Sequence, residues 1–547
     1  MPRCPVESRF ANSQRAYVGG TVPFALGYWC RRNVANEVAP NFRTMIADFS
    51  GMRVTVMGLG SFGGGIGAVR FLAARRAQVT VSDLKPAGEL SQSLAGISGC
   101  ANVIQHLGEH RDADFRDADL IVASPAVPGK NRYLQIARDA GVPVTSEMNL
   151  FWERNRARTI GVTGSSGKST TTALIYALLS AGPLSAGPAS VAGPHFEGTG
   201  AAQREPVRAP FAPLSAAGAS RIWLGGNIGK SLLPDVDQIQ STDWVVLELS
   251  SFQLDALAPL QPNPHVAVVT NFAPNHLDRH GSIEAYRAAK QNLLRWQTAD
   301  RFAILNQSDA DVSAWHTNAR KFWFGREDEG KQGMFAVGFD TYKRRALFRF
   351  GPREQVLPLG RWLSLPGVHN FQNALAAACT ALVLGCGLEG IEKGLSGFRA
   401  LPHRLELVGE TAERKFYDDS KATTPEAAIL ALGAFRAPVV LLAGGYDKGV
   451  DLRGLARAIV DRRVKGVALL GQTGQKLKEH LEEFAPHGEV PAKVHVTLEA
   501  AFQWAAARSA PGDIVLLSPG CASYDWFPNY EARGDEFQRL ARAWQPA

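Results

Sequence analysis

Short apolar runs, many of them rich in β-branched residues, recur along the chain and alternate with segments that have helical spacing. Strands that are buried on both faces of a parallel sheet have continuous apolar runs of this kind. Helices between such strands provide the crossover connections that parallel pairing requires. The pattern therefore predicts an α/β fold with mostly parallel sheets.

The runs fall into three blocks. In the first block we expect strands at 53–58, 78–83 and 119–124, with a helix through 69–76. In the second we expect strands at 159–164, 244–250, 265–271 and 301–306, a helix from Lys168 and a closing helix at 369–385. In the third we expect strands within 415–420, 437–445, 465–471, 493–497 and 513–520, most of them separated by helices.

The length supports the same division, because 547 residues exceed what one hydrophobic core supports. Because 147–400 contains the glycine-rich segment TGSSGKST, we predict a central P-loop-type ATPase domain there, between a Rossmann-like N-terminal domain at 52–146 and a Rossmann-like C-terminal domain at 401–547. Residues 1–51 lack helical or strand periodicity and are expected to be a disordered extension. Residues 182–220, rich in Ala, Gly, Pro and Ser, are expected to be a loop insertion.

The composition disfavours several classes of protein. No apolar run approaches the roughly 18 residues of a membrane-spanning helix, and the N-terminal MPRCPVESRF lacks the apolar region of a secretory signal. The six cysteines lie far apart, without metal-ligand or disulfide-scaffold spacing, which favours a cytoplasmic protein. The net charge of +8 comes from basic residues spread through the chain, which favours anionic small molecules over nucleic acid as partners. We expect a monomer.

TGSSGKST, at 163–170, joins a predicted strand to a predicted helix. Its two glycines let backbone N–H groups turn toward a phosphate, and the helix N-terminus adds its positive dipole end. Lys168 supplies a mobile positive charge, and Ser169 offers a hydroxyl to Mg²⁺. Val162 stands where a standard Walker A motif has glycine, which disfavours a common P-loop NTPase. A mere strand-to-helix connection would not need the lysine, so we predict ATP binding here.

Two further segments carry candidate metal ligands. Glu248 ends the apolar strand in WVVLELS, where a carboxylate can hold Mg²⁺ beside a phosphate loop. A strand-end acid is often only solvated, but its pairing with TGSSGKST favours the metal. The segment TNFAPNHLDRHGSIEAYRAAK contains His276, Asp278, His280 and Lys290, without zinc-finger spacing. These residues by themselves leave the role of the segment open.

The first block contains a glycine motif of its own. MGLGSFGGGIG fits G-x-G-x-x-G at Gly58, Gly60 and Gly63, and Asp83 follows at the end of the next predicted strand. Taken alone, this arrangement predicts a dinucleotide such as NAD.

Four motifs occur in an order that resembles the Mur ligases: TGSSGKST, the strand ending at Glu248, NHLDRHGS with a later AAK, and PGVHNFQN at 366–373. The resemblance covers nearly all of 52–547 outside the insertion. Folylpolyglutamate synthetases share the central domain but not all the flanking motifs. In the third block, LPHRLE, DDSKATTPEA, GGYDKG and LSPGCASYDWFPNYEARGDEF resemble the members of the family that add glutamate.

The resemblance implies a substrate set and a reaction. ATP would activate the carboxylate of UDP-N-acetylmuramoyl-L-alanine as an acyl phosphate, and the amine of glutamate would then attack it, in peptidoglycan precursor synthesis. For the first domain the resemblance implies that the glycine motif binds the UDP part of the precursor instead of NAD. Two Mg²⁺ ions and a carbamylated Lys290 are the implied cofactors. D-Glutamate is the expected amino acid, although handedness depends on pocket geometry and the sequence leaves L-glutamate open.

The resemblance also assigns roles to individual residues. Lys168, Glu248, His276 and Lys290 would be catalytic, and the last three would hold Mg²⁺ together with Ser169. The implied ATP-binding residues are Gly164, Ser165, Ser166, Gly167, Lys168, Ser169, Thr170, Asn373, Arg404 and Asp419. The implied residues for the UDP precursor are Gly58, Gly60, Ser61, Phe62, Gly63, Asp83 and Asn227. The implied glutamate-binding residues are Lys421, Thr423, Lys448, Ser523 and Tyr530.

Four residues depart from the family pattern. Leu84 and Lys85 replace the usual Thr-Arg, Ala126 replaces a glycine, and Tyr530 replaces a phenylalanine. Two other functions stay open. A NAD-dependent oxidoreductase could use the N-terminal glycine motif, but it has no use for TGSSGKST. A non-catalytic, Mur-like nucleotide-binding regulator is the other, and the presence of all four implied catalytic residues argues against it.

Overall fold

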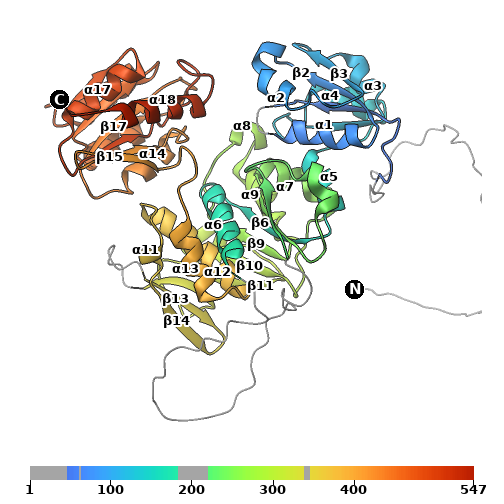
Figure 1. Ribbon diagram of the computed structural model, residues 1–547, viewed down its shortest axis with the longest axis horizontal. Coiled ribbons are helices and arrows are strands. Elements are labelled where there is room, and N and C mark those ends of the chain that lie inside the picture. The colour runs from blue at the N-terminus through green and yellow to red at the C-terminus, as the bar shows by residue number, and fades with distance from the viewer. Residues whose placement is uncertain (1–45, 61–62, 183–219, 338–344, 547) are drawn as a thin grey trace, which may run out of the picture. The chain divides into compact units, whose positions relative to one another are not determined.

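The computed structural model describes residues 46–60, 63–182, 220–337 and 345–546. These residues belong to one compact unit, Met45–Ala547, which contains three sheets, each with its own helices (Figure 1). The α/β fold with three domains and mostly parallel sheets is thereby confirmed. No helix in these ranges combines the length and the apolar composition that crossing a bilayer requires.

The folded part begins slightly before the first strand. Phe49 is 1% exposed, and its ring packs edge-on against Phe71 with the centroids 5.6 Å apart. Gly51 donates its backbone N–H to the carbonyl of Arg76 over 3.0 Å. Residues 46–51 therefore belong to the fold, although they were expected to be part of the extension. Residues 1–45, and 183–219 of the expected insertion, lie outside the described residues.

The first sheet contains five parallel strands in the order β3-β2-β1-β4-β5. Because β1 pairs with both β2 and β4, the order reverses at β1, and open parallel sheets bind ligands at such a switch point. The strands are β1 Arg53–Met57, β2 Gln78–Asp83, β3 Val103–Leu107, β4 Leu120–Ala123 and β5 Val144–Thr145. The helices are α1 Gly64–Ala74, η1 Ala87–Leu90, α2 Ser91–Ala95, α3 Asp112–Arg116, α4 Arg132–Asp139 and α5 Glu147–Arg154.

The second sheet contains nine strands in the order β14-β13-β12-β11-β10-β9-β6-β8-β7. Its strands are β6 Arg158–Thr163, β7 Ile222–Gly226, β8 Trp244–Glu248, β9 Val266–Val269, β10 Phe302–Asn306, β11 Arg320–Gly325, β12 Gly333–Val337, β13 Arg345–Phe350 and β14 Arg353–Leu357. Its helices are α6 Lys168–Ala181, η2 Leu233–Gln238, α7 Ser251–Leu257, η3 Ala258–Leu260, α8 Leu277–His280, α9 Ile283–Gln291, α10 Ala310–Ser313, α11 Leu359–Trp362, α12 Val368–Val383 and α13 Leu388–Gly397.

The third sheet contains six strands in the order β15-β16-β20-β17-β18-β19. Only the β15–β16 pair is antiparallel. Its strands are β15 Glu406–Thr411, β16 Arg414–Asp418, β17 Val439–Gly444, β18 Gly466–Leu470, β19 Ala492–Val494 and β20 Ile514–Leu517. Its helices are α14 Pro425–Leu432, α15 Arg453–Asp461, α16 Gly474–Phe484, α17 Leu498–Arg508 and α18 Tyr530–Ala543.

Alternate residues of the central strands enter two different cores. In β8, Val246 packs with α6 and α12 on one face, whereas Val245 and Leu247 join the core on the other face. Each of these side chains is fully buried, and burial of one such side chain stabilises the fold by about 1.5–3 kcal/mol. The strands are therefore anchored on both faces, which makes their carboxyl ends a rigid base for the loops that follow them.

Candidate active site

Residues 163–167 form a tight turn between β6 and α6. Gly164 has a φ of 148° and Gly167, the N-cap of α6, has a φ of 77°, both in the region that favours glycine. A Cβ on Gly164 would lie 1.9 Å from Thr270 Oγ1, and a Cβ on Gly167 would lie 2.4 Å from Asn373 Oδ1. Within the described residues no side chain caps α6. Its first backbone N–H groups are therefore available to an anion.

Two lysines converge on this turn. Lys168 Nζ donates to the carbonyls of Gly164 and Ser165 over 3.0 and 3.2 Å, and Lys290 Nζ donates to the carbonyl of Gly164 over 2.7 Å. Burial lowers the pKa of both amines. For Lys290, which is 1% exposed, the charge of Lys168 lowers the pKa further, well below its usual value. A neutral amine is the form of lysine that reacts with CO2 to give a carbamate.

Tyr286 fixes the position of Lys290 on α9. The two residues are four positions apart, so they lie on one face of the helix, and Nζ of Lys290 lies 4.7 Å from the centroid of the Tyr286 ring. The Tyr286 hydroxyl is 3.1 Å from Oγ of Ser165 in the turn at 163–167. Tyr286 and Lys290 are each 1% exposed, and their contacts join α9 directly to this turn.

Glu248 lies at the end of β8, opposite Val162 of β6. Asn227 Nδ2 donates to Glu248 Oε1 over 3.0 Å. Glu248 is 2% exposed, and its Oε2 is buried without a hydrogen-bond partner among the described residues. A buried carboxylate requires a compensating charge, and its charge raises the pKa of both Lys168 and Lys290 against the effect of burial. An orphaned oxygen in this place fits a ligand of a divalent cation.

His276 is the N-cap of α8 and has a φ of 53°. Its ring packs against Phe252, with the centroids 5.1 Å apart. Burial, followed by the positive charges of Lys168 and Lys290, lowers the pKa of His276. The neutral imidazole is the metal-binding form. Together with the buried Ser169 hydroxyl and Glu248, His276 fits the donor set expected for Mg²⁺, and Lys290 joins it only as a carbamate.

A cavity of about 990 Å³ brings candidate residues of all three predicted domains together. Pockets for drug-sized ligands measure roughly 300–1,000 Å³, so the space suits a large substrate. Its lining includes Gly58, Gly60, Gly63, Lys168, Ser169, Asn227, His276, Lys290, Lys421 and Tyr530.

A smaller cavity of about 130 Å³ holds the residues expected around the nucleotide. Arg404 donates from its guanidinium to Ser169 Oγ over 3.2 Å, and its Nε is buried without a partner among the described residues. Asp419 accepts from the backbone N–H of Leu405 over 3.1 Å and from the Ser518 hydroxyl over 2.7 Å. Burial raises the pKa of Asp419 to about 7. The lining includes Ser166, Gly167, Thr170, Asn373, Arg404 and Asp419.

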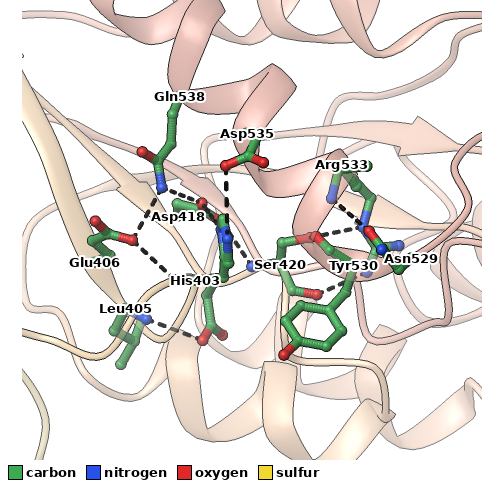
Figure 2. Close-up of polar contacts among 12 residues, drawn as sticks. His403, Leu405, Glu406, Asp418, Ser420, Asn529, Tyr530, Arg533, Asp535 and Gln538 are labelled. Atoms are coloured by element: carbon green, nitrogen blue, oxygen red, sulfur yellow. Dashed lines mark hydrogen bonds and ion pairs between the residues drawn. The ribbon is translucent and has the colours of Figure 1, made fainter. Parts of the chain in front are cut away.

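The backbone on both sides of Arg404 is held in the left-handed region, with a φ of 59° at His403 and 46° at Leu405. Such conformations persist where the surroundings over-determine them. Figure 2 shows His403 enclosed by acids: its Nδ1 lies 2.7 Å from Asp418 Oδ2, and its backbone N–H donates to Glu406 Oε2 over 2.9 Å. The network therefore sets the direction in which the Arg404 side chain projects from the backbone.

The same cluster could be taken for a metal site, because donor atoms of His403, Glu406 and Asp418 lie within 4.8 Å of one another. Gln538 Nε2, however, donates to Asp418 and Glu406 over 2.9 and 3.0 Å (Figure 2). Its Oε1 accepts from Arg542 over 2.7 Å. An N–H donor therefore faces both carboxylates. Burial lowers the pKa of His403, but Asp418, by hydrogen bond and by charge, outweighs burial and raises it. The cluster is a hydrogen-bond network.

Helix α18 passes this network at a glycine. A Cβ on Gly534 would lie 2.1 Å from His403 Nδ1 and 2.8 Å from Asp418 Oδ2. Any side chain at this position would displace the imidazole from its acid.

Of the residues expected to bind glutamate, Lys421 and Tyr530 lie side by side. Nζ of Lys421 is 4.9 Å from the centroid of the Tyr530 ring, and both residues line the larger cavity. Burial, followed by the charge of Arg404, lowers the pKa of Lys421 to about 8. The lysine therefore remains mostly cationic at neutral pH and can pair with a carboxylate.

The other three residues expected to bind glutamate make different contacts. Lys448 Nζ is 5.2 Å from the centroid of the Tyr524 ring, and Ser523 is buried. Thr423 donates its backbone N–H to the carbonyl of Lys421 over 2.9 Å. None of the three lines either of the two cavities. Their assignment to glutamate stays a prediction.

In the first domain, Asp83 holds the glycine turn. One of its carboxylate oxygens accepts from the backbone N–H groups of Leu59 and Gly60 over 2.9 and 3.4 Å, and the other accepts from Lys85 over 3.0 Å. Gly63, with a φ of 85°, is the N-cap of α1. The turn and the start of α1 line the larger cavity. Ser61 and Phe62, also expected here, lie outside the described residues.

Three family models match the chain: the Mur ligase MurD-like N-terminal domain at 52–146, the Mur ligase middle domain at 162–381 and the Mur ligase glutamate ligase domain at 403–521. A relative from Acidobacterium capsulatum is 37% identical over 511 residues, which cover 91% of this chain and 99% of the relative. The chain belongs to the Mur ligase family.

Two relatives with similar sequences carry the same name. The relative from Acidobacterium capsulatum is called UDP-N-acetylmuramoylalanine–D-glutamate ligase, and so is a protein of Roseiflexus that is 36% identical over 90% of this chain and 99% of its own. Among solved structures, the UDP-N-acetylmuramate-alanine ligase MurC of Thermotoga maritima matches with a TM-score of 0.53 and 17% identity, over 90% of this chain and 99% of that one. The MurF ligase of Thermotoga maritima in complex with ADP matches with a TM-score of 0.51 and 16% identity, over 91% and 97%. The likeness to these two structures supports the Mur ligase fold.

Sequence reasoning missed two residues that shape the phosphate loop of this Mur ligase. The Thr270 hydroxyl donates to the carbonyl of Ser166 over 2.6 Å, and Asn271 Oδ1 accepts from the Ser166 N–H over 2.8 Å. Both residues directly follow β9, which is paired in parallel with β6. Because the carboxyl ends of adjacent parallel strands meet at one edge of the sheet, the strand order could have revealed them.

Proposed function

We propose that this Mur ligase uses ATP to join D-glutamate to UDP-N-acetylmuramoyl-L-alanine, in the cytoplasmic synthesis of peptidoglycan precursors. The larger cavity carries the proposal, because residues assigned to the precursor, to the γ-phosphate and to glutamate line the same space. The names of relatives that are 33–37% identical support the choice of substrates.

The reaction has two steps. A carboxylate oxygen of the precursor attacks the γ-phosphorus of ATP, which gives an acyl phosphate and ADP. The amine of glutamate then attacks the acyl carbon, the C–O bond to phosphate breaks, and inorganic phosphate leaves as the amine loses a proton. Activation is needed because a free carboxylate offers the amine no adequate leaving group.

The residues of the chain have distinct tasks in this scheme. Lys168, which donates to the carbonyls of Gly164 and Ser165, would turn to the γ-phosphate, and Arg404 would add a second positive charge from the Ser169 side. Mg²⁺, held by Ser169, Glu248, His276 and carbamylated Lys290, would neutralise charge on the transferring phosphate. Lys421 would hold a carboxylate of glutamate.

The two other functions make different predictions for one assay. Phosphate release should occur only when the precursor, ATP and D-glutamate are all present, and L-glutamate and other amino acids should give far less. A non-catalytic regulator would bind nucleotide without releasing phosphate. An oxidoreductase would change the absorbance of a nicotinamide cofactor and ignore ATP. Phosphate release that requires neither the precursor nor glutamate would contradict the proposal.

Asp83→Ala is expected to raise KM for the precursor about tenfold or more, because removal of an acceptor of two backbone N–H groups loosens the glycine turn. The KM values for ATP and glutamate should stay close to those of the wild type, and kcat should change less than the KM for the precursor. Steady-state kinetics with each substrate varied in turn measure this. If NAD, and not UDP, bound the first domain, Asp83→Ala would leave the KM for the precursor unchanged.

A further inference from the structure

Glu147 is an acid to which the scheme above gives no task. It is the first residue of α5 and lines the larger cavity together with Gly63, Gly64 and Asn227. Its Oε1 accepts a hydrogen bond from the hydroxyl of Ser231. Among the described residues its Oε2 has no hydrogen-bond partner, and this oxygen lies 4.0 Å from the position that a Cβ would take on Gly64. The free oxygen therefore faces the N-terminus of α1.

Ser231 engages one of the two carboxyl oxygens of Glu147. Its Oγ accepts from the backbone N–H of Leu233 over 3.2 Å and donates its hydrogen to Glu147 Oε1. A Cβ on Gly67 of α1 would lie 2.3 Å from Ser231 Oγ, which shows how closely the helix holds this hydroxyl. With Ser231 as its donor, Oε1 acts as an acceptor. An added proton has its place on Oε2, toward the cavity.

Within the described part of the chain, no fixed positive charge offsets the carboxyl. The end of α1 that faces it consists of Gly63, Gly64, Gly65 and Ile66, which carry no ionisable group. Lys230, next to Ser231 in the chain, is exposed and paired with Asp235 over 2.8 Å. Burial raises the pKa of Glu147 to about 7, and the hydrogen bond from Ser231 opposes this only in part.

We propose that Glu147 is a further precursor-binding residue, which donates a hydrogen bond from Oε2, as a carboxylic acid, to the diphosphate of the UDP precursor at the N-terminus of α1. The proposal rests on the proposed function, because it takes the precursor as the ligand of the glycine turn. Backbone N–H groups at a helix N-terminus favour an anion. A carboxylate in this place would repel the diphosphate, whereas a carboxylic acid adds one more donor to the same anion.

The test is the pH dependence of KM for the precursor in the full-length wild type and in Glu147→Gln. The raised pKa belongs to an acid, so the binding-competent protonated form prevails below about pH 7 and is lost above it. The apparent KM of the wild type should be level in mild acid and rise up to about tenfold per pH unit above pH 7, because only the competent fraction binds. Glu147→Gln should remove this rise, since an amide donates at every pH.

Two further variants complete the design. Glu147→Ala should raise the KM for the precursor about tenfold at pH 6, where the wild type carries its donor. Glu153→Gln changes an acid on the same helix that is paired with Arg154, and should keep the pH profile of the wild type. The KM for ATP, measured in the same assays, separates the effect from titration of Asp419 and Lys421. Thermal unfolding of each variant identifies any loss of fold.

Superimposable pH profiles of the wild type and Glu147→Gln would overturn the inference, and so would a folded Glu147→Ala variant whose KM at pH 6 equals that of the wild type. Both results leave the proposed function intact, because ligation still takes place. If no variant and no wild-type enzyme releases phosphate with the precursor and D-glutamate, the proposed function itself fails and the inference fails with it.

Discussion

Lys168→Ala is expected to lower kcat for ligation by roughly a hundredfold or more, with the fold intact. The amine donates to the carbonyls of Gly164 and Ser165, and burial lowers its pKa. Because burial opposes the charge of this amine, we expect the fold to tolerate its removal. During transfer the same amine would face the γ-phosphate, where a preorganised charge stabilises the transition state.

Phosphate release and thermal unfolding measure the two halves of this prediction. Lys393→Ala is the matched control, because Lys393 is exposed on α13. The control should match the wild type in both measurements. Lys168→Ala with the activity of the wild type would remove the assignment of TGSSGKST as the phosphate loop.

Lys290→Ala is expected to lose activity to a similar extent, and added bicarbonate or acetate should restore part of it. Lys290 is 1% exposed, and both burial and the charge of Lys168 favour its neutral form. The neutral amine can take up CO2 to give a carbamate, which supplies the oxygen ligands that Mg²⁺ prefers. A small carboxylate in the space left by Lys290→Ala can replace these oxygens.

Lys290→Arg separates the carbamate from a simple positive charge. Arginine keeps the charge but cannot form the carbamate, so Lys290→Arg should be as inactive as Lys290→Ala and should not respond to acetate. The mass of the intact wild-type chain, measured under conditions that retain CO2, should include the carbamate. Full activity of either variant would show that Lys290 does not act as a metal-binding carbamate.

The central strands were predictable because burial on both faces gives them a mark in the sequence, a continuous apolar run. β2, Gln78–Asp83, coincides with the predicted strand, and β8 and β10 begin or end within two residues of the predicted bounds. Strands at and near the sheet edges lack this mark. β13, with the sequence RALFRF, lies between β12 and the edge strand β14 and pairs antiparallel with both, and no strand was predicted there. β19 spans Ala492–Val494, so it shares only its last two residues with the strand expected at 493–497, and Val496 is 85% exposed.

The site was predictable as far as its motifs are local. The turn at 163–167 follows from a strand, two glycines and a helix start, all adjacent in the chain. The contacts of Ser166 with Asn271, of Ser165 with Tyr286 and of Ser231 with Glu147 join residues far apart in sequence, and no local motif specifies them. Asp83 was expected to bind the precursor, but its bonds to the glycine turn became visible only in the fold.

Gly534 shows that intolerance to substitution does not by itself identify chemistry. Glycine inside a helix is less favourable than alanine by about 1 kcal/mol, so a survey of all substitutions would on propensity alone favour alanine here. The close approach to His403 and Asp418 reverses that preference. We expect such a survey to rank Gly534 near the reactive lysines, although no substrate need ever touch it. Gly534 has no side chain that could contact a substrate. Its role is to leave room for His403 and Asp418, which position the neighbouring Arg404.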